Sequence, residues 1–430
     1  MTILSDAKSA WGTPANDKVN LGFLGCGGRG TWLINGFLKR DDINVASLCD
    51  PVQRRREGLA KIATEAGMTP KLEEDYRKVL DDPSVDAVIT ATPDHWHALH
   101  TVQACQAGKD VYVEKPASHS AWEGKKMVEA ARKYKRVVQV GTQNRSAPYN
   151  MAAKKYIEEG KLGKIHFVRV FNMKEWLNFN MGQVEKIPEG LNWDLWSGPA
   201  PMHEYIPTYF YNWHHFWDYS SGDIINDGIH QIDLARWLVG KELPKTVYSV
   251  GGRYNSTGGA ETPDTQIATF EYDDLLFNFE LTLYTPYMLK IDGEVRENDM
   301  FPYWPQCATR IEIYGDKALM IVGRHGGGWE VYVRTKERKP VVVDSCYGRF
   351  PDPEHRENFI QCIRSRELPN ADIDKGYKSA LLAEYATISY RLGGQKLSID
   401  TETGTIKDCP ESASYYKRTY RDPFVVPDEV

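Results

Sequence analysis

One stretch decides the fold of this chain: Val19-Asn20-Leu21-Gly22-Phe23-Leu24-Gly25-Cys26-Gly27-Gly28-Arg29-Gly30. Its apolar half predicts a buried strand, and residues 31–39, which follow the glycines, suit a helix. A strand, a Gly-x-Gly-x-x-Gly turn and a helix in this order are typical of a dinucleotide-binding site. Gly25 permits the tight turn, Gly27 lets the backbone approach a pyrophosphate, and Gly30 lets the helix pack on the strand.

A carboxylate follows at the expected distance from these glycines. A second apolar run, residues 43–49, ends at Asp50, which lies 20 residues beyond Gly30. A carboxylate in this place is expected to bind the hydroxyl groups of the adenosine ribose. Because no basic residue adjoins Asp50, the sequence favours NAD as cofactor. Arg54 lies within reach of the same pocket, so NADP stays a possible but less favoured cofactor.

The bulk composition describes a globular protein of two domains. The chain has 430 residues, more than the ~250–300 that one core usually supports. The net charge is −6, and no basic run is longer than residues 54–56, which argues against nucleic-acid binding. No apolar stretch approaches the ~18 residues of a membrane span. The seven cysteines include no Cys-x-x-Cys pair, so we expect free thiols.

The first residues give a prediction about compartment. Residues 1–17 are polar and lack an apolar core, so they are expected to form a loose leader and not a signal peptide. We therefore predict a cytoplasmic location for the chain as given, with export possible if an N-terminal signal was removed.

Residues 18–144 are predicted to form a first domain in which strands and helices alternate. This alternation indicates a doubly wound parallel sheet, which binds ligands at the carboxyl ends of its strands. The expected strands cover residues 21–24, 43–49, 85–91, 111–114 and 137–141, and the expected helices cover residues 31–39, 54–66, 72–80, 96–107 and 122–134. The strand ends carry Gly25, Asp50, Thr92-Pro93, Glu114-Lys115-Pro116 and Gly141-Thr142-Gln143.

Three motifs of this domain resemble those of one family. The glycine turn is followed by Thr92-Pro93-Asp94-His95-Trp96-His97 and then by Gly108-Lys109-Asp110-Val111-Tyr112-Val113-Glu114-Lys115-Pro116. In this combination the chain resembles the Gfo/Idh/MocA oxidoreductases, which include inositol dehydrogenases and glucose–fructose oxidoreductase. Glu-Lys-Pro after a strand is the most specific of the three motifs. The resemblance covers residues from about 19 to 394.

The resemblance implies that Lys115 lies between the nicotinamide and the sugar. The residues by themselves agree, because a lysine at a strand's carboxyl end can bind a substrate hydroxyl and tune a neighbouring base. The resemblance also places the turn at 94–97 and the Gln143 region near the nicotinamide, although His97 alone would more commonly be a packing histidine. The predicted cofactor-binding residues are Gly25, Gly27, Gly28, Arg29, Gly30, Asp50, Thr92, Pro93, His97, Glu114, Lys115 and Gln143.

Residues 145–408 are predicted to form a second, α+β domain for substrate binding and oligomerisation. Residues from about 176 to 219 lack a regular pattern and carry many aromatic side chains. Aromatic faces suit sugar rings, while a satellite aromatic core beneath a long loop explains the same residues equally well. Arg145, Trp176 and His214 are candidate substrate contacts.

A helix expected near residues 221–233 carries polar side chains on one face and isoleucines on the other. Asp223, Asn226, Asp227 and His230 share the polar face at helical spacing. Such short polar side chains favour a preorganised substrate site over a solvated surface. No metal site is predicted, because zinc prefers three or four converging His or Cys ligands.

The resemblance implies that His230 is the acid–base group for hydride transfer. The family often has an Asp where this chain has Asn226. Two interpretations stay open: either Asp227 or Asp223 supplies the charge that tunes His230, or Asn226 binds a substrate hydroxyl and no carboxylate does.

The sequence of the remainder of the second domain predicts a large, mostly antiparallel open sheet with one face exposed to solvent. In the resembling family such a sheet forms the dimer surface, so we expect a homodimer or homotetramer. A second aromatic loop, residues 284–306, is expected to line the pocket or a subunit contact. Helices at 354–365 and 376–392 are expected to return toward the first domain, and residues 409–430 form a tail. Further strands are expected at residues 165–172, 246–250, 265–272, 275–284, 310–314, 329–334 and 340–343.

The sequence thus predicts an NAD-dependent oxidoreductase acting on a secondary hydroxyl of a sugar, cyclitol or glycoside, with a glycoside oxidised at C3 as the preferred example. His230 would take the hydroxyl proton, and Lys115 would bind the reacting oxygen. Two alternatives stay open. One is an NAD-dependent glycosidase that oxidises its substrate transiently, with no net redox change. The other is a non-catalytic NAD(H)-binding sensor, motivated by Asn226.

Overall fold

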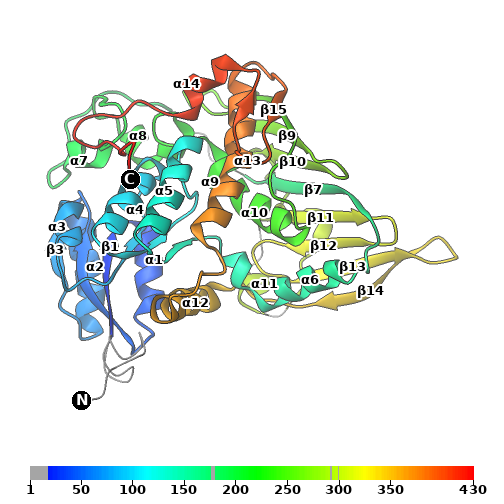
Figure 1. Ribbon diagram of the computed structural model, residues 1–430, viewed down its shortest axis with the longest axis horizontal. Coiled ribbons are helices and arrows are strands. Elements are labelled where there is room, and N and C mark those ends of the chain that lie inside the picture. The colour runs from blue at the N-terminus through cyan, green and yellow to red at the C-terminus, as the bar shows by residue number, and fades with distance from the viewer. Residues whose placement is uncertain (1–17, 176–179, 291–292, 299) are drawn as a thin grey trace.

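The computed structural model describes residues 18–175, 180–290, 293–298 and 300–430. It contains a six-stranded sheet and a ten-stranded sheet, and the long helix α13 (Ile373–Arg391) lies between the two (Figure 1). The predicted fold class is confirmed: a Rossmann-type parallel sheet is followed by an α+β domain with a large, mostly antiparallel sheet.

The first sheet has the strand order β3-β2-β1-β4-β5-β6, and all of its pairs are parallel. The order reverses beside β1, where doubly wound sheets bind their ligands. Both faces are covered by helices, which explains why β1 and β4 are apolar along almost their whole length. The strands are β1 (Val19–Leu24), β2 (Ile43–Cys49), β3 (Lys71–Glu73), β4 (Ala87–Thr90), β5 (Asp110–Val113) and β6 (Val138–Val140), and the helices are α1 (Gly28–Phe37), α2 (Gln53–Glu65), α3 (Tyr76–Leu80), α4 (His97–Gln106) and α5 (Ala121–Lys133).

One predicted helix of this domain is wrong in its first half. Residues 71–73 form the edge strand β3, and the helix α3 begins only at Tyr76. Ser47 of β2 pairs with Lys71, so the strand is set by a long-range ladder that local sequence does not reveal. Asp75 then caps α3 by accepting a hydrogen bond from the Arg77 backbone N–H.

The second sheet has the order β14-β13-β12-β11-β7-β10-β9-β8-β15-β16. Among its described pairs, β7 and β10 run parallel and the others antiparallel. The hairpin of β13 and β14 extends far from the rest of the molecule (Figure 1). The strands are β7 (Ile165–Met173), β8 (Thr246–Gly252), β9 (Thr265–Glu271), β10 (Leu276–Thr282), β11 (Arg310–Gly315), β12 (Leu319–Gly323), β13 (Trp329–Arg334), β14 (Pro340–Cys346), β15 (Leu397–Ile399) and β16 (Ile406–Lys407).

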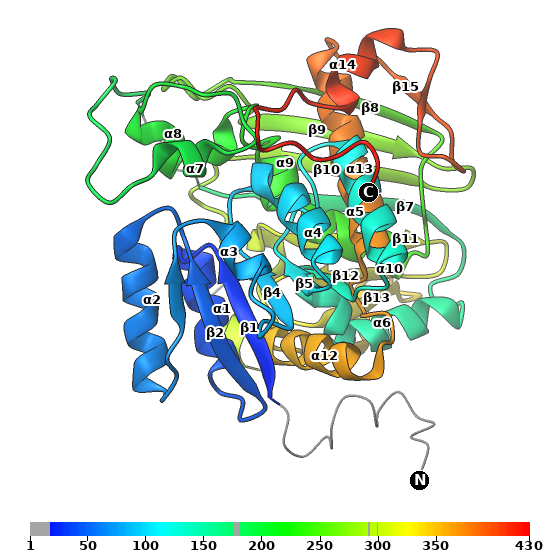
Figure 2. The same ribbon diagram turned by 60° about the vertical axis from the view of Figure 1, so that its left-hand side comes forward.

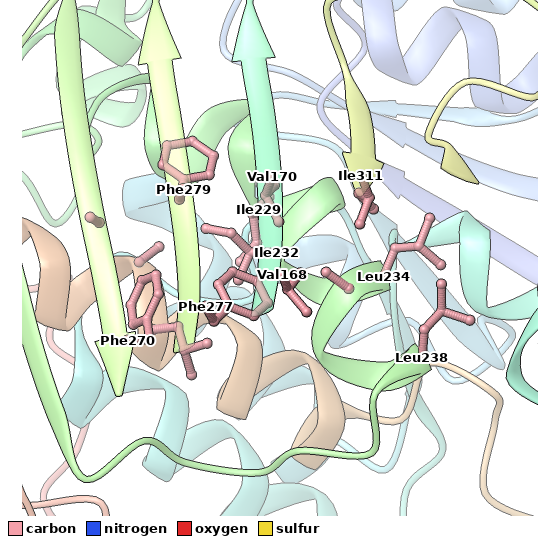
Figure 3. Packing of buried hydrophobic residues seen from close by; sticks show 14 of the residues in the cluster. Val168, Val170, Ile229, Ile232, Leu234, Leu238, Phe270, Phe277, Phe279 and Ile311 are labelled. Carbon is pink, nitrogen blue, oxygen red and sulfur yellow. The ribbon is translucent and has the colours of Figure 1, made fainter. Parts of the chain in front are cut away.

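Helix α10 (Gly228–Leu238) packs on the inner face of this sheet. Figure 3 shows Ile229 and Ile232 of α10 beside Val168 of β7 and Phe277 of β10. The approach is close, since a Cβ on Gly228 would lie 2.6 Å from the Phe279 ring. This packing fixes the isoleucine face of the helix and leaves the opposite face for polar residues.

The chain returns to the first domain after β14 and again in the tail that follows β16. Helix α12 (Asp352–Ser365) contributes Phe359 and Ile360 to the core beneath β1, and the tail contributes Phe424 and Val426 to the core beside α4. The remaining helices are α6 (Pro148–Glu158), α7 (Trp193–Ser197), α8 (Pro207–Tyr211), α9 (Asp223–Asn226), α11 (Gly293–Glu297) and α14 (Ala413–Tyr416). Within the described ranges, no helix has the length and apolar character needed to cross a membrane.

Candidate active site

The glycine loop between β1 and α1 forms one end of the site. Gly25 has a φ of +94°, a conformation that side chains disfavour, and a Cβ on Gly30 would lie 2.1 Å from the Gly25 carbonyl oxygen. By contrast, a Cβ on Gly28 would meet nothing within 4 Å. The loop is therefore tight on its protein side and open on its outer side, as a backbone cradle for a pyrophosphate requires.

Asp50 at the end of β2 faces this loop. Its carboxylate accepts hydrogen bonds from the backbone N–H groups of Cys26 and Val52, at 2.7 and 2.8 Å. Burial raises the pKa of Asp50, while Arg55 and the two N–H groups favour the charged form. Arg55 lines the cleft, whereas Arg54 donates to the Tyr211 hydroxyl at 3.4 Å. The arrangement holds a carboxylate where an adenosine ribose is expected.

A cleft of about 910 Å³, including its open mouth, runs from the glycine loop to Lys115 and Asn226. Trp196, Phe210 and Trp213 from the long loop of the second domain form its opposite wall. Figure 2 shows α7 and α8 of this loop beside the first domain. Ten of the predicted residues line the cleft: Gly25, Gly27, Gly28, Arg29, Asp50, Thr92, Pro93, Glu114, Lys115 and Asn226.

The aromatic loop also has its own core. Trp193 and Trp196 stack at 4.6 Å between ring centroids, and both belong to a buried aromatic cluster with Tyr205, Phe216 and Tyr219. Most of the rings therefore form a satellite core, and Trp196 also reaches the cleft wall, while stacking of these rings on a sugar stays a prediction. Trp176 lies outside the described residues.

Three predicted cofactor residues lie behind the cleft surface. Gly30 packs on Gly25 as described above. The His97 ring nitrogens lie 2.6 Å from the Pro116 carbonyl oxygen and 3.0 Å from that of Thr92, so His97 ties two strand-end turns together. Gln143 donates to the Tyr112 hydroxyl at 3.3 Å. These residues hold the cleft in shape from beneath its surface.

Lys115 joins the two domains through Asn226. Its ammonium donates to the Asn226 carbonyl oxygen at 2.5 Å and to Oδ1 at 3.0 Å. The Asn226 amide in turn donates to Asp223 at 3.3 Å. An Asp at position 226 could accept from Lys115 but could not donate to Asp223. The neighbouring carboxylate therefore explains why an amide suits this position.

His230 lies one turn further along, on α10. It is buried, and its Nδ1 has no hydrogen-bond partner among the described residues. Burial lowers the pKa of His230 well below its usual value, and Arg324 and Lys115 lower it further, whereas Asp227 raises it. The imidazole is therefore neutral at neutral pH and able to accept a proton.

Asp227 does not contact His230 by a side-chain hydrogen bond within the described structure; it binds cations instead. Its carboxylate lies 3.1 Å from Lys174, 2.8 Å from Lys290 and 3.1 Å from Arg324. Burial opposes its ionisation, but these three cations hold the pKa of Asp227 well below its usual value. Asp227 is thus a permanent charge near His230.

Two candidate substrate contacts differ in position. Arg145 is buried, and its guanidinium binds the Asp233 carboxylate of α10 at 2.9 to 3.0 Å, outside the cleft lining. His214 is buried in the turn before α9, with Lys174 and Lys115 among the charges that lower its pKa after burial itself. His214 therefore lies near the reacting end, whereas Arg145 anchors α10.

Three site residues were absent from the predicted set, namely Lys174, Lys290 and Arg324, whereas Asp94 belongs to the turn that was predicted to lie near the nicotinamide. Asp94 lines the cleft and accepts a hydrogen bond from the Ser220 hydroxyl at 2.5 Å. Lys174 directly follows β7, so the strand-end reasoning that selected Lys115 would also have found it. Nowhere in the described ranges do three or more His, Cys, Asp or Glu side chains form a group that could hold a metal ion.

Comparison with known proteins places the chain in a family. Residues 19–142 match the family described as an oxidoreductase family with an NAD-binding Rossmann fold, and residues 154–397 match its C-terminal alpha/beta domain. The chain belongs to the Gfo/Idh/MocA oxidoreductase family, and it is an NAD-dependent oxidoreductase.

Similar proteins include sugar and cyclitol dehydrogenases. A scyllo-inositol 2-dehydrogenase (NAD(+)) of Bacillus subtilis is 26% identical over 328 residues, which cover 76% of this chain and 80% of the relative. Inositol 2-dehydrogenase 2 of Saccharopolyspora erythraea is 25% identical over 92% of this chain and 98% of its own length.

A solved structure shares the fold. The WlbA dehydrogenase from Bordetella pertussis, in complex with NADH and UDP-GlcNAcA, has a TM-score of 0.65 at 22% identity and covers 89% of this chain and 99% of its own.

Proposed function

We propose that the protein oxidises a secondary hydroxyl of a carbohydrate with NAD, and that a glycoside oxidised at C3 is its substrate. The observation that carries the proposal is that Lys115 and Asn226 meet at one end of the cofactor cleft, with buried, neutral His230 one helical turn further along and close enough for Lys115 to lower its pKa. The inositol dehydrogenases and the levoglucosan dehydrogenase among the similar proteins support a polyhydroxylated substrate.

Each side chain has a role in this reaction. NAD, when bound, supplies the hydride acceptor. His230 accepts the hydroxyl proton, because its buried imidazole is neutral. The Lys115 ammonium donates a hydrogen bond to the same oxygen and stabilises its developing negative charge. Asn226 positions that ammonium through its two oxygens. Acid–base assistance of this kind contributes ~10²–10⁴ in rate.

The aromatic wall supports a substrate larger than a free monosaccharide. Trp213 and Phe210 line the cleft, and Tyr211 nearby is 57% exposed. Exposed rings next to a cleft can stack on the C–H face of an aglycone or a second sugar. Screening NAD reduction against a panel of sugars, cyclitols and glycosides, with mass spectrometry of the products, tests the proposal. No NADH formation with any glycoside would contradict it.

One observation favours a second candidate, a glycosidase with transient oxidation and retained NAD. The Gln53 backbone N–H donates to Gly190 at 2.8 Å, and that of Asn192 donates to Pro51 at 3.0 Å. These bonds hold the loop of the second domain beside Asp50, and we propose that this contact slows the release of NAD. Product analysis separates the candidates: the first gives an oxidised glycoside, and the second gives a free sugar without net NADH.

Asp94 gives the first prediction, a pH dependence. Burial raises its pKa to about 7, against the opposing effect of Lys115. As the pH rises through about 7, Asp94 ionises and helps Lys115 to retain its proton. We expect kcat/KM to rise with pH across this range in the wild-type protein and to lose that rise in Asp94→Asn. An unchanged pH–rate profile in the variant would reject this role.

The outer face of the large sheet gives the second prediction. Along β8 and β9 buried and accessible residues alternate, and Tyr248, Val250 and Ile267 are 40 to 47% exposed on the accessible face. We propose that this face pairs with a second copy to form a homodimer or homotetramer. Sedimentation at micromolar concentration should show an oligomer, and Ile267→Glu should shift it toward monomer. A single species of 49.0 kDa for the wild type would refute the proposal.

A further inference from the structure

The polar end of the cleft holds an excess of positive charge. Lys174, Lys290 and Arg324 all bind the single carboxylate of Asp227, at 3.1, 2.8 and 3.1 Å. Lys174 also binds Asp223 at 2.8 Å, and Lys115 lies nearby on Asn226. Four cations therefore face two carboxylates.

The surrounding groups that the structure describes do not remove this excess. Arg29 and Arg296 are matched by Glu114 and Asp352, whose carboxylates lie 2.7 to 4.0 Å from them. His230 and His325 are neutral, because burial lowers the pKa of each. Asp94 adds at most one negative charge, since its pKa is about 7. Among the described residues, the basic side chains of this cluster therefore outnumber the carboxylates that contact them.

An unbalanced charge in a buried site is costly unless a ligand neutralises it. Arg324 is 5% exposed, and its Nε has no hydrogen-bond partner among the described residues. The Lys290 side chain, in contrast, is 45% exposed and reaches the same carboxylate from the second aromatic loop. The cluster thus combines the buried guanidinium of Arg324, one nitrogen of which has no described hydrogen-bond partner, with the accessible ammonium of Lys290.

The cluster adjoins the reacting end of the site. Asp227 directly follows Asn226, which lines the cofactor cleft, and precedes His230 by less than one helical turn. Arg324 and Lys115 are both close enough to lower the pKa of His230. A group bound by the cluster would belong to the same molecule whose hydroxyl meets His230.

We infer that the substrate carries a carboxylate, as a uronic acid or its glycoside does, and that Lys290 and Arg324 bind it. This inference rests on the proposed carbohydrate oxidation and narrows it. The negative charge of the substrate would neutralise the positive charge of the lysine and arginine side chains around Asp227. The planar guanidinium of Arg324 suits a carboxylate, and the flexible Lys290 closes on it from the solvent side.

Matched substrates test the inference with the NAD-loaded protein. Initial rates of NAD reduction are compared for methyl β-D-glucoside and methyl β-D-glucuronide, and for the corresponding galactosides. We expect kcat/KM to be at least about tenfold higher for the uronides, the effect of one charge-assisted hydrogen bond. If kcat/KM for the neutral glycosides is equal or higher, the inference that the substrate carries a carboxylate is wrong. NADH formation with either substrate would still support the proposed oxidation.

Variants locate the binding group. Lys290→Gln should raise KM for the uronide about tenfold more than it raises KM for the neutral glycoside. Arg324→Lys keeps the positive charge but loses the planar guanidinium, so it should also raise KM for the uronide. Lys155→Gln is the control: it removes the same charge from the exposed surface of α6, where Lys155 lies 4.0 Å from Glu159. Equal effects of Lys290→Gln and Lys155→Gln would overturn the assignment.

Two further outcomes are informative. If glucose 6-phosphate is oxidised more efficiently than the uronides, the site binds phosphate and the carboxylate assignment fails. If no sugar reduces NAD, calorimetry of methyl β-D-glucuronide with the NAD-loaded protein still decides: binding that Lys290→Gln weakens supports the anion site although the proposed oxidation fails, and no binding overturns both.

Discussion

His230→Ala should lower kcat for the oxidised glycoside by roughly 10²-fold or more and leave the affinity for NAD nearly unchanged. The imidazole is neutral because burial lowers its pKa, and Lys115 is close enough to lower that pKa further. Its removal leaves the hydroxyl proton without an acceptor. The cofactor contacts lie on the other domain, so they should survive. Steady-state kinetics and NADH fluorescence titration measure the two quantities.

Controls separate chemistry from packing in this variant. His230→Asn fills more of the buried site and should lose as much activity, because an amide is not a base. Asp227→Asn should lower the pKa of His230 further, since the Asp227 charge raises it, and should move the acidic limb of the pH–rate profile to lower pH. Asn226→Ala should act mainly on KM. Near-normal activity in His230→Ala would refute its role and direct the search to Asp223, Asp227, His214 and His215.

Gly30→Ala should weaken NAD binding by up to roughly 10²-fold. The added Cβ would lie 2.1 Å from the Gly25 carbonyl oxygen, and backbone on both sides cannot rotate away as a side chain could. Helix α1 would have to move off β1 and distort the loop that receives the pyrophosphate. Overpacking of this kind costs ~1–3 kcal/mol or more, which corresponds to roughly 10²-fold in affinity. NADH titration and thermal unfolding report the loss.

Gly58→Ala supplies the matched control within the same domain. Gly58 lies exposed in the middle of α2, and its Cβ would meet nothing within 4 Å. An alanine there should stabilise the helix by ~0.5–1 kcal/mol and leave NADH binding unchanged. A Gly30→Ala protein that bound NADH within threefold of wild type, at the same melting temperature, would show that the glycine loop is not the cofactor cradle.

Local signals made much of the first domain predictable. The strand at Val19–Leu24, the glycine turn and Asp50 are all encoded within one βαβ unit, and the residues at the strand ends follow from its parallel topology. The isoleucines of α10 were predictable for the same reason, since helical periodicity alone places them on the sheet. These features need no knowledge of distant contacts.

The charged end of the site could not be predicted in this way. Lys290 and Arg324 reach Asp227 from loops that follow β10 and β12, more than 60 residues away in sequence. Arg145 shows the converse case: its residue type and position suggest a ligand contact, but its guanidinium binds Asp233, 88 residues later. Tertiary contacts, and not spacing, decide which buried cations remain available to a ligand.

The most direct measurement follows the hydrogen that leaves the substrate. With a glycoside deuterated at C3 and the NAD-loaded protein, a single turnover should place deuterium on C4 of the nicotinamide, detected by mass spectrometry of the released cofactor, and His230→Ala should slow this transfer without redirecting the label. Deuterium found in the solvent, or an unlabelled cofactor alongside a converted substrate, would contradict NAD-dependent oxidation at this carbon.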